Sequence, residues 1–119
     1  MVPLVAVIGK GEKMKESEIE QILVRDVRKA GGRAYKWVSP GSGGVPDRIV
    51  IFPDRQPIFV ELKAEGGRLS RLQKFQIERL SQLGQYVTVV KGINGLIQFF
   101  QDCGYTEISD ELIRKYGCF

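Results

Sequence analysis

Apolar residues recur at helical spacing in two stretches of the chain. In the first, residues 16–30, an apolar side chain returns every three or four positions, and the glycine pair that follows predicts the end of a helix. In the second, one face of a helix is marked before Gly84 ends the pattern. The residues on that face are Leu69, Leu72, Gln76, Leu80 and Leu83.

Four other stretches have the composition of β-strands. They are residues 33–38 (RAYKWV), 47–52 (DRIVIF), 58–63 (IFVELK) and 85–92 (QYVTVVKG). A loop rich in glycine and proline (SPGSGGVP) separates the first two, and the turn PDRQP joins the second and third in a hairpin-like connection. The fourth strand follows a helical crossover, so we expect it to lie parallel to a neighbour in the sheet.

The two ends of the chain carry shorter signals. Residues 93–104 and 109–117 predict two short helices, the second opened by a Ser or Asp cap. This apolar tail is long for a small sheet, and we expect it to pack in a dimer interface or to cover the sheet edge. Residues 1–13 are expected to be an extension whose apolar run fits a strand. That run is too short to span a membrane and lacks the basic region that precedes the core of a signal peptide.

The pattern as a whole predicts one α/β domain with a central mixed sheet. Its elements follow the order α-β-β-β-α-β, with a short C-terminal helical tail. A length of 119 residues allows a single core and no more. We expect the extension at 1–13, the core at 14–92 and, as part of the same domain, the tail at 93–119.

Composition excludes several kinds of chemistry. The chain has no histidine, which rules out Ser-His-Asp and Cys-His catalysis and His-ligated zinc. Cys103 and Cys118 lack a metal-ligand spacing and are expected to be reduced thiols of a cytosolic protein. Neither a P-loop nor a dinucleotide-binding glycine motif is present, so we expect no small-molecule cofactor. The net charge of +4 is a modest indication of an acidic partner such as nucleic acid.

Three ionisable residues fall where the predicted hairpin would bring them together. Side chains alternate along a strand, so Glu61 and Lys63 point to the same face, about 6.6–6.8 Å apart. Asp47 begins the neighbouring strand, with 13 residues between it and Glu61. The hairpin therefore predicts that all three meet at one end of the sheet, beside the SPGSGGVP loop.

Carboxylates that converge in this way have a chemical use. Two carboxylates repel each other and stay ionised when a cation neutralises them. Oxygen ligands without His or Cys favour Mg²⁺ or Mn²⁺, and a nearby ammonium suits a phosphate or an attacking water. This set is typical of metal-assisted phosphodiester hydrolysis. Each of these motifs alone has an ordinary explanation. Glu61 and Lys63 could form a solvated ion pair, and a Pro-Asp dipeptide is common in turns. Only their combination on one hairpin favours a catalytic metal site.

The same residues carry a resemblance to a known family. VPDRIVIF, the spacing from Asp47 to Glu61, and VELKA resemble the PD-(D/E)XK nuclease signature. The flanking segments ESEIEQILVRDVRKAGG and GGRLSRLQKFQIERLSQLGQYVTVVKG narrow the likeness, over residues 16–92, to the stand-alone VRR-NUC domains of phage and bacterial proteins. The resemblance implies a restriction-endonuclease-like fold and a Mg²⁺- or Mn²⁺-dependent nuclease related to Holliday-junction resolvases. It also implies a homodimer acting on branched DNA in repair, in the cytoplasm of a bacterial or phage-infected cell.

The resemblance assigns roles position by position. Asp47 and Glu61 would ligate the metal, and the backbone carbonyl of Leu62 would add a ligand. Lys63 would orient or polarise the attacking water and stabilise the charge that develops on the phosphate. The family's helical glutamine matches Gln73. Its serine neighbour three positions earlier also gives the spacing of a capping box, so Gln73 could close a helix N-terminus, and the two roles can coexist.

The glutamate of the first helix has two candidates. The family's Glu-x-x-apolar pattern matches at Glu16, which lies near the centre of the apolar stripe that must face the sheet. Glu20 lies at the edge of that stripe, and the spacing to Gly31 in archaeal resolvases favours it. A capping box with Ser17 is the ordinary account of Glu20. Glu18 points away and is expected to be solvated. We take Glu16 as the catalytic glutamate and Glu20 as its alternative.

Several basic and loop residues are candidate DNA contacts. A charge run is usually a solvated face, but in a nuclease some of these residues would bind phosphate in a salt-dependent, sequence-independent way. The glycine-rich loop is either a connector or a source of backbone amides for a phosphate. Tyr35 and Trp37 share a strand face and are expected in the core or in a dimer interface rather than under DNA bases. The candidate DNA-binding residues are Arg33, Lys36, Ser39, Gly41, Ser42, Arg48, Arg68, Arg71 and Lys74.

Three functions remain after this reading. The first is a homodimeric endonuclease that cuts four-way junctions, a symmetric enzyme for a symmetric substrate. The second is a nuclease of flaps, ends or single strands, and the third is a non-catalytic nucleic-acid-binding module. The acid, acid and lysine argue against the third, because a binding module has no use for converging carboxylates near phosphate.

Overall fold

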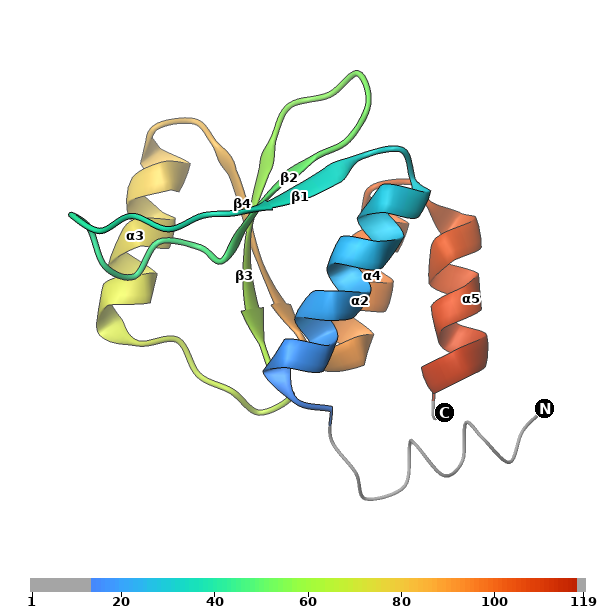
Figure 1. Ribbon diagram of the computed structural model, residues 1–119. Helices are drawn as coiled ribbons and strands as arrows, with labels where there is room; N and C mark the ends of the chain where they lie inside the picture. The colour runs from blue at the N-terminus through green and yellow to red at the C-terminus, as the bar shows by residue number, and fades with distance from the viewer. Residues whose placement is uncertain (1–13, 118–119) are drawn as a thin grey trace.

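The computed structural model describes residues 14–117 (Figure 1). It is a small α/β domain with a four-stranded mixed sheet and helices on both of its faces. The elements, in chain order, are α2 (Glu16–Lys29), β1 (Arg33–Lys36), β2 (Arg48–Ile51), β3 (Ile58–Lys63), α3 (Arg71–Gln82), β4 (Tyr86–Lys91), α4 (Gly92–Asp102) and α5 (Thr106–Tyr116).

The sheet has the spatial order β1-β2-β3-β4. β1, β2 and β3 are antiparallel to one another, and β4 is parallel to β3. The antiparallel steps follow from short connections, whereas the α3 crossover returns the chain to the end of the sheet at which β3 began. The parallel pairing of the last strand confirms the expectation drawn from the crossover.

One face of the sheet, the core face, is covered by α2 and α4, with α5 packed outside them (Figure 1). It carries Val50, Val60, Leu62 and Val90, alternate residues of three strands that are inaccessible to solvent. The apolar stripe of α2 packs on this layer, as its period predicts. The hydrophobic core therefore lies on one side of the sheet only.

The C-terminal tail completes this core. Leu96 and Phe100 of α4 and Leu112 of α5 are buried in the same cluster as α2 and the strands. The tail thus covers a face of the sheet and not its edge, and its apolar side chains are already enclosed within one copy of the chain. The expectation that it forms a dimer interface or covers the sheet edge is wrong for this reason.

The start of α5 also differs from the sequence prediction. The helix begins at Thr106, after an N-cap at Tyr105 that makes no side-chain capping bond. Ser109 is buried inside the helix, and its hydroxyl donates to the Thr106 carbonyl at 2.9 Å. Because that hydroxyl is used within the first turn, the predicted Ser or Asp cap does not form.

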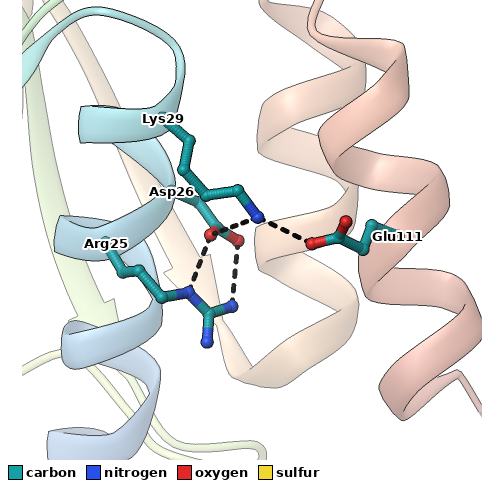
Figure 2. Close-up of polar contacts among 4 residues, drawn as sticks. All are labelled: Arg25, Asp26, Lys29 and Glu111. Atoms are coloured by element: carbon teal, nitrogen blue, oxygen red, sulfur yellow. Dashed lines mark hydrogen bonds and ion pairs between the residues drawn. The ribbon is translucent and has the colours of Figure 1, made fainter.

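A buried carboxylate joins α2 to α5 (Figure 2). Asp26 is only 1% exposed, and it accepts from Arg25 Nε at 2.9 Å. Lys29 Nζ lies 3.8 Å from Asp26 and 2.7 Å from Glu111 Oε1 on α5. A buried charge is tolerated when it is paired, so these contacts fix the C-terminal half of α2 against the tail.

The opposite face of the sheet, the open face, carries Tyr35, Ile49, Phe59 and Val87, which stand in one cross-strand row. It is covered in part by α3 and by the 37–47 loop. Trp37 from that loop packs on Phe59 with a ring separation of 5.3 Å.

Two glycines allow the loop to approach α3. Gly44 has φ +80°, and a Cβ there would lie 2.8 Å from the backbone of Leu72. A Cβ on Gly43 would lie 3.0 Å from the Leu72 side chain. Gly44 is therefore required by packing as well as by its backbone conformation, whereas Gly43 only makes a close contact.

Two sequence expectations fall outside the described residues: the strand in segment 1–13 and the state of Cys118. Within residues 14–117, no helix is long and apolar enough to cross a membrane.

Replacing Gly44 with alanine should destabilise the fold by about 1–3 kcal/mol, because the new side chain meets both a strained φ and the α3 backbone. Chemical denaturation would measure this loss. Gly41→Ala is the matched control, since a Cβ there meets nothing within 4 Å, and its effect should stay below ~0.5 kcal/mol. Equal effects of the two substitutions would contradict the packing role of Gly44.

Candidate active site

Asp47 and Glu61 face each other across the β2–β3 hairpin. Arg48 is paired with Val60, and extending this register by one residue places Asp47 opposite Glu61. Directly opposed residues of antiparallel strands have Cβ atoms about 4.5–5.5 Å apart. The register of the hairpin therefore forces two carboxylates together at the end of β3.

Asp47 is held by two bonds from neighbouring backbone. Its Oδ2 atom accepts from the amide of Leu62 at 2.8 Å, and its carbonyl accepts from the amide of Trp37 at 3.0 Å. The hydrogen bond from the Leu62 amide to the Asp47 side chain replaces a backbone hydrogen bond between β3 and β2, at the point where β2 begins. The carboxylate is thus fixed at the edge of β3.

Glu61 is almost completely enclosed, with 1% of its surface exposed. Its Oε2 atom lies 3.5 Å from Lys63 Nζ and accepts from Gln73 Nε2 at 3.0 Å. Burial, followed by the charges of Asp47 and Glu16, raises the pKa of Glu61 to about 7, although Lys63 acts in the opposite direction. Near neutral pH Glu61 is therefore partly protonated, and a bound cation would favour its ionised form.

Gln73 closes the capping box that its spacing predicts and also contacts Glu61. Its backbone amide donates to Ser70 Oγ at 3.1 Å, and its Oε1 atom accepts from the Ser70 amide at 2.9 Å, which closes a capping box. The same side chain donates to Glu61 from its other end. The cap of α3 thereby fixes the orientation of the amide that reaches the carboxylate.

The two glutamates of α2 have different surroundings. Glu20 Oε2 accepts from Arg48 Nε at 2.8 Å and lies 3.4 Å from Lys36 Nζ, so its charge is neutralised within the protein. Glu16 is exposed at the first turn, and its charge acts on Glu61. Of the two, Glu20 is thus paired with two cations, whereas the charge of Glu16 acts on the carboxylate of Glu61. The capping contact of this helix comes from Glu18, whose Oε1 accepts from the Lys15 amide at 2.9 Å, and not from Glu20.

Comparison with known proteins agrees with this arrangement. Residues 4–94 match the VRR-NUC domain. The chain belongs to the VRR-NUC family. It is also 49% identical over 77 residues to the protein named "Putative nuclease p44" of Acyrthosiphon pisum secondary endosymbiont phage 1, a match that covers 65% of this chain and 83% of that protein.

Two solved structures share the VRR-NUC fold with this chain. One, described as a VRR_NUC domain, has a TM-score of 0.62 at 26% identity and covers 87% of this chain and 98% of its own. The other, described as a VRR_NUC domain protein, has the same TM-score of 0.62 at 19% identity and covers 82% and 92%, respectively. At that lower identity the likeness concerns the fold alone.

The donor set of this VRR-NUC protein suits a hard cation, although its acids are not gathered into a complete cage. Within residues 14–117, no group of three acidic, His or Cys side chains is close enough to hold a metal. What fits is the pair of Asp47 and Glu61, whose mutual repulsion a divalent ion would relieve. The Leu62 carbonyl lies on the same edge of β3 as its amide, which bonds Asp47.

The basic candidates are placed unevenly around the VRR-NUC site. Arg68, Arg71 and Lys74 are exposed next to the N-terminus of α3, close in the chain to Gln73. Lys36 is exposed near the site but is paired with Glu20.

Three other placements weaken individual candidates. Arg48 is mostly buried and donates both to Glu20 and to the Ala34 carbonyl at 3.0 Å, so its guanidinium has internal partners. Arg33 pairs with Ile51, at the end of β2 away from Asp47. In the loop, Gly41 and Ser42 are exposed and Ser39 is half-buried, and the amide of Ser42 donates to the Ser39 carbonyl. The sequence pattern did not distinguish these surroundings.

Sequence reasoning missed two contacts that shape the site. One is the Glu20–Arg48 pair, which ties α2 to β2. The other is Gln76, whose Nε2 donates to the Gly43 carbonyl at 3.1 Å and so holds the loop against α3. Gln76 follows Gln73 by three residues, so both side-chain amides lie on one side of the helix. This spacing could have predicted the contact, but Gln76 was counted with the apolar face instead.

Glu61→Gln should stabilise the metal-free protein at pH 8 by up to ~3 kcal/mol. The pKa of Glu61 is about 7 in the folded chain against 4.5 for the free side chain. The pKa of Glu61 is higher in the folded chain than in the unfolded chain. The protonated carboxyl therefore makes its full contribution to folding stability below pH 4.5, and this contribution is lost as the pH rises through 7. The advantage of glutamine should therefore fall below ~1 kcal/mol at pH 5.

Urea denaturation at both pH values, in the presence of EDTA, would measure this difference. Glu78→Gln, on the exposed side of α3, is the control for the loss of one glutamate charge. If the Glu61→Gln protein were less stable than the wild type at pH 8, ionised Glu61 would not destabilise the fold, and the expectation would be contradicted.

Proposed function

We propose that this VRR-NUC protein is a structure-specific DNA endonuclease that uses Mg²⁺ or Mn²⁺ and cuts four-way junctions as a homodimer. We also propose that its site is of the PD-(D/E)XK, restriction-endonuclease-like type. One observation carries the proposal: Asp47 and Glu61 are opposed across a hairpin, with Lys63 3.5 Å from Glu61. A carboxylate pair at this position costs stability, and such a cost is typical of sites that bind and react.

The chemistry follows from these residues. Asp47, Glu61 and the Leu62 carbonyl would hold the metal, which when bound would lower the pKa of a water and neutralise charge on a phosphate. Lys63 supplies an ammonium beside Glu61, where it would orient the attacking water or stabilise the charge that develops in the transition state. Gln73 fixes the rotamer of Glu61 through its hydrogen bond.

Glu16 extends the same charge cluster from α2. It lies at the first turn of the helix, where its side chain is exposed and close enough to influence Glu61. We assign it to orient a metal-bound or attacking water from the solvent side. Glu20 is less suited to this role because Arg48 and Lys36 already neutralise it.

The substrate is expected to be DNA held by its phosphates. Arg68, Arg71 and Lys74 surround the N-terminus of α3, next to the residue that contacts Glu61. Contacts of this kind make binding salt-dependent and independent of sequence. Junction cleavage in a bacterial or phage-infected cell, in DNA repair, is the activity that fits a symmetric pair of such sites.

The proposal is tested by cleavage of labelled DNA in Mg²⁺ and in Mn²⁺, with a four-way junction, a flap, a linear duplex and a single strand as substrates. Asp47→Asn and Lys63→Ala should each lower junction cleavage by at least ~10²-fold, the size expected when one electrostatic group is removed from a transition state. Paired nicks in the junction, absent in EDTA, are the expected result for the wild type.

Two controls match these variants in residue type. Lys115 is exposed on α5, which packs outside the core face and away from Lys63, so Lys115→Ala should leave cleavage unchanged. Asp54 lies in the turn between β2 and β3, so Asp54→Asn tests loss of an acid away from the site. If the protein cut only flaps or ends, the second candidate function, a nuclease of flaps, ends or single strands, would replace junction cleavage. DNA binding without metal-dependent cleavage of any substrate would leave the non-catalytic module.

A further inference from the structure

The strand beside β3 brings a second lysine to the carboxylate end of the sheet. Lys91 pairs with Lys63 in the parallel register of β3 and β4, so the two side chains lie on the same side of the sheet. Lys91 is extended, with φ −107° and ψ 115°, and the alternation of faces therefore holds up to this residue. Neighbouring strands are about 4.8 Å apart. The two lysines thus start from adjacent positions beside Glu61.

The two lysines differ in how firmly they are held. Lys63 Nζ lies 3.5 Å from Glu61 Oε2, and only 14% of the Lys63 side chain is exposed. A Cβ on Gly67 would lie 3.3 Å from the Lys63 Cβ, so the loop after β3 packs on the stem of this lysine. Lys91 is exposed, and the ion pairs within residues 14–117 include Lys63 but not Lys91. Lys91 therefore presents its charge to solvent next to the site.

The position of Lys91 is unfavourable for a positive charge. Its ammonium and that of Lys63 repel each other across neighbouring strands. Lys91 is also the N-cap of α4, where it makes no side-chain capping bond and where the first turn carries no acid. Ser, Thr, Asp and Asn are preferred at an N-cap, and the partial positive charge of a helix N-terminus disfavours a cation. Residues that break such local rules are found most often at functional sites.

We propose that Lys91 is a further substrate-binding residue, which contacts a phosphate of the DNA strand beside the phosphate that is cut. Across this end of the sheet the acids lie on the β2 and β3 side and the lysines on the β3 and β4 side. A DNA strand that crosses in this direction would place the cut phosphate at Lys63 and a neighbouring phosphate at Lys91. The choice of DNA as the ligand rests on the proposed function.

A structural role is the alternative for Lys91, because the loop after β3 carries an acid nearby. A Cβ on Gly92 would lie 3.2 Å from the Cβ of Glu65, so Glu65 packs beside the residue that follows Lys91. If Lys91 served to attract this loop, removal of its charge would lower the melting temperature. If Lys91 serves the substrate, removal of its charge relieves repulsion in the free protein, and the loss is measured only with DNA.

The test measures binding of a fluorescent four-way junction and a linear duplex by anisotropy, in EDTA, between about 50 and 200 mM salt. Lys91→Gln should weaken binding of both by about 3- to 10-fold and lower the slope of log Kd against log salt by about 1, because one phosphate contact is lost. Lys91→Arg should keep the affinity and the slope. Lys115→Gln removes an exposed charge on α5 and should bind like the wild type.

Cleavage kinetics and thermal unfolding give two further readouts. Lys91→Gln should raise KM with little change in kcat, because a phosphate beyond the cut makes the same contact before and during the reaction. Lys63→Ala should instead lower kcat. The melting temperature of Lys91→Gln should be no lower than that of the wild type. A fall of more than about 3 °C, with unchanged DNA binding, would assign the lysine to the fold and overturn its contact with the substrate.

The outcomes separate Lys91 from the proposed function. If the wild type cut no DNA but Lys91→Gln lost affinity and salt slope, the nuclease would be overturned and the phosphate contact would stand. If the wild type cut junctions and Lys91→Gln kept its affinity, salt slope and KM, the phosphate contact would be overturned and the nuclease would stand. Equal losses in Lys91→Gln and Lys115→Gln would also overturn the contact, because they would report net charge. A fall in kcat as large as that of Lys63→Ala would place Lys91 at the cut phosphate instead.

Discussion

The repulsion between Asp47 and Glu61 is the constraint around which the rest of this domain is arranged. The pairing of β2 with β3 leaves these carboxylates no way to separate, since a one-residue slip would turn every core side chain of a strand to the wrong face. The hydrophobic core therefore holds the acids together against their own electrostatics. The cost appears in the pKa of Glu61, which lies near 7 because burial and the Asp47 charge both disfavour ionisation.

The surrounding elements each control one part of that site. α2 is tied at one end to α5 through Asp26 and Lys29 and, one turn after Glu16, to β2 through Glu20 and Arg48. These contacts fix the helix that presents Glu16. On the other side, α3 presents Gln73 through its own N-terminal cap. The site is thus assembled from the β2–β3 hairpin, α2 and α3. Contacts of their own hold the two helices in place beside the hairpin.

Much of the fold could be predicted because its signals are local. The periods of the helices, the strand composition and the glycine breaks identified the described elements, and the hairpin placed Asp47, Glu61 and Lys63 at one end of the sheet. The capping box of Gln73 could be foreseen from its spacing, whereas the catalytic roles of the site residues remain predictions. Signals of this type depend on neighbours in the chain, and a sequence shows those directly.

The parts that could not be predicted depend on distant partners. Nothing local distinguishes Glu16 from Glu20, and the distinction comes from Arg48, on another element of the fold. The enclosure of the tail was missed because an apolar helix looks the same whether its own sheet or a second copy covers it. The exposure of Leu72 and Leu83 was missed for a similar reason, because their spacing alone predicts a face that packs on the sheet.

The exposure of α3 has a consequence for the rigidity of the site. A helix with no buried side chain contributes little burial energy of its own, so it should open locally at a lower free energy than α2 or α4. Its amide hydrogens would then exchange with solvent before those of the core helices. Because Gln73 belongs to this helix, local unfolding of α3 would break its hydrogen bond to Glu61. A buried carboxylate of the domain is therefore oriented by a helix that buries none of its own side chains.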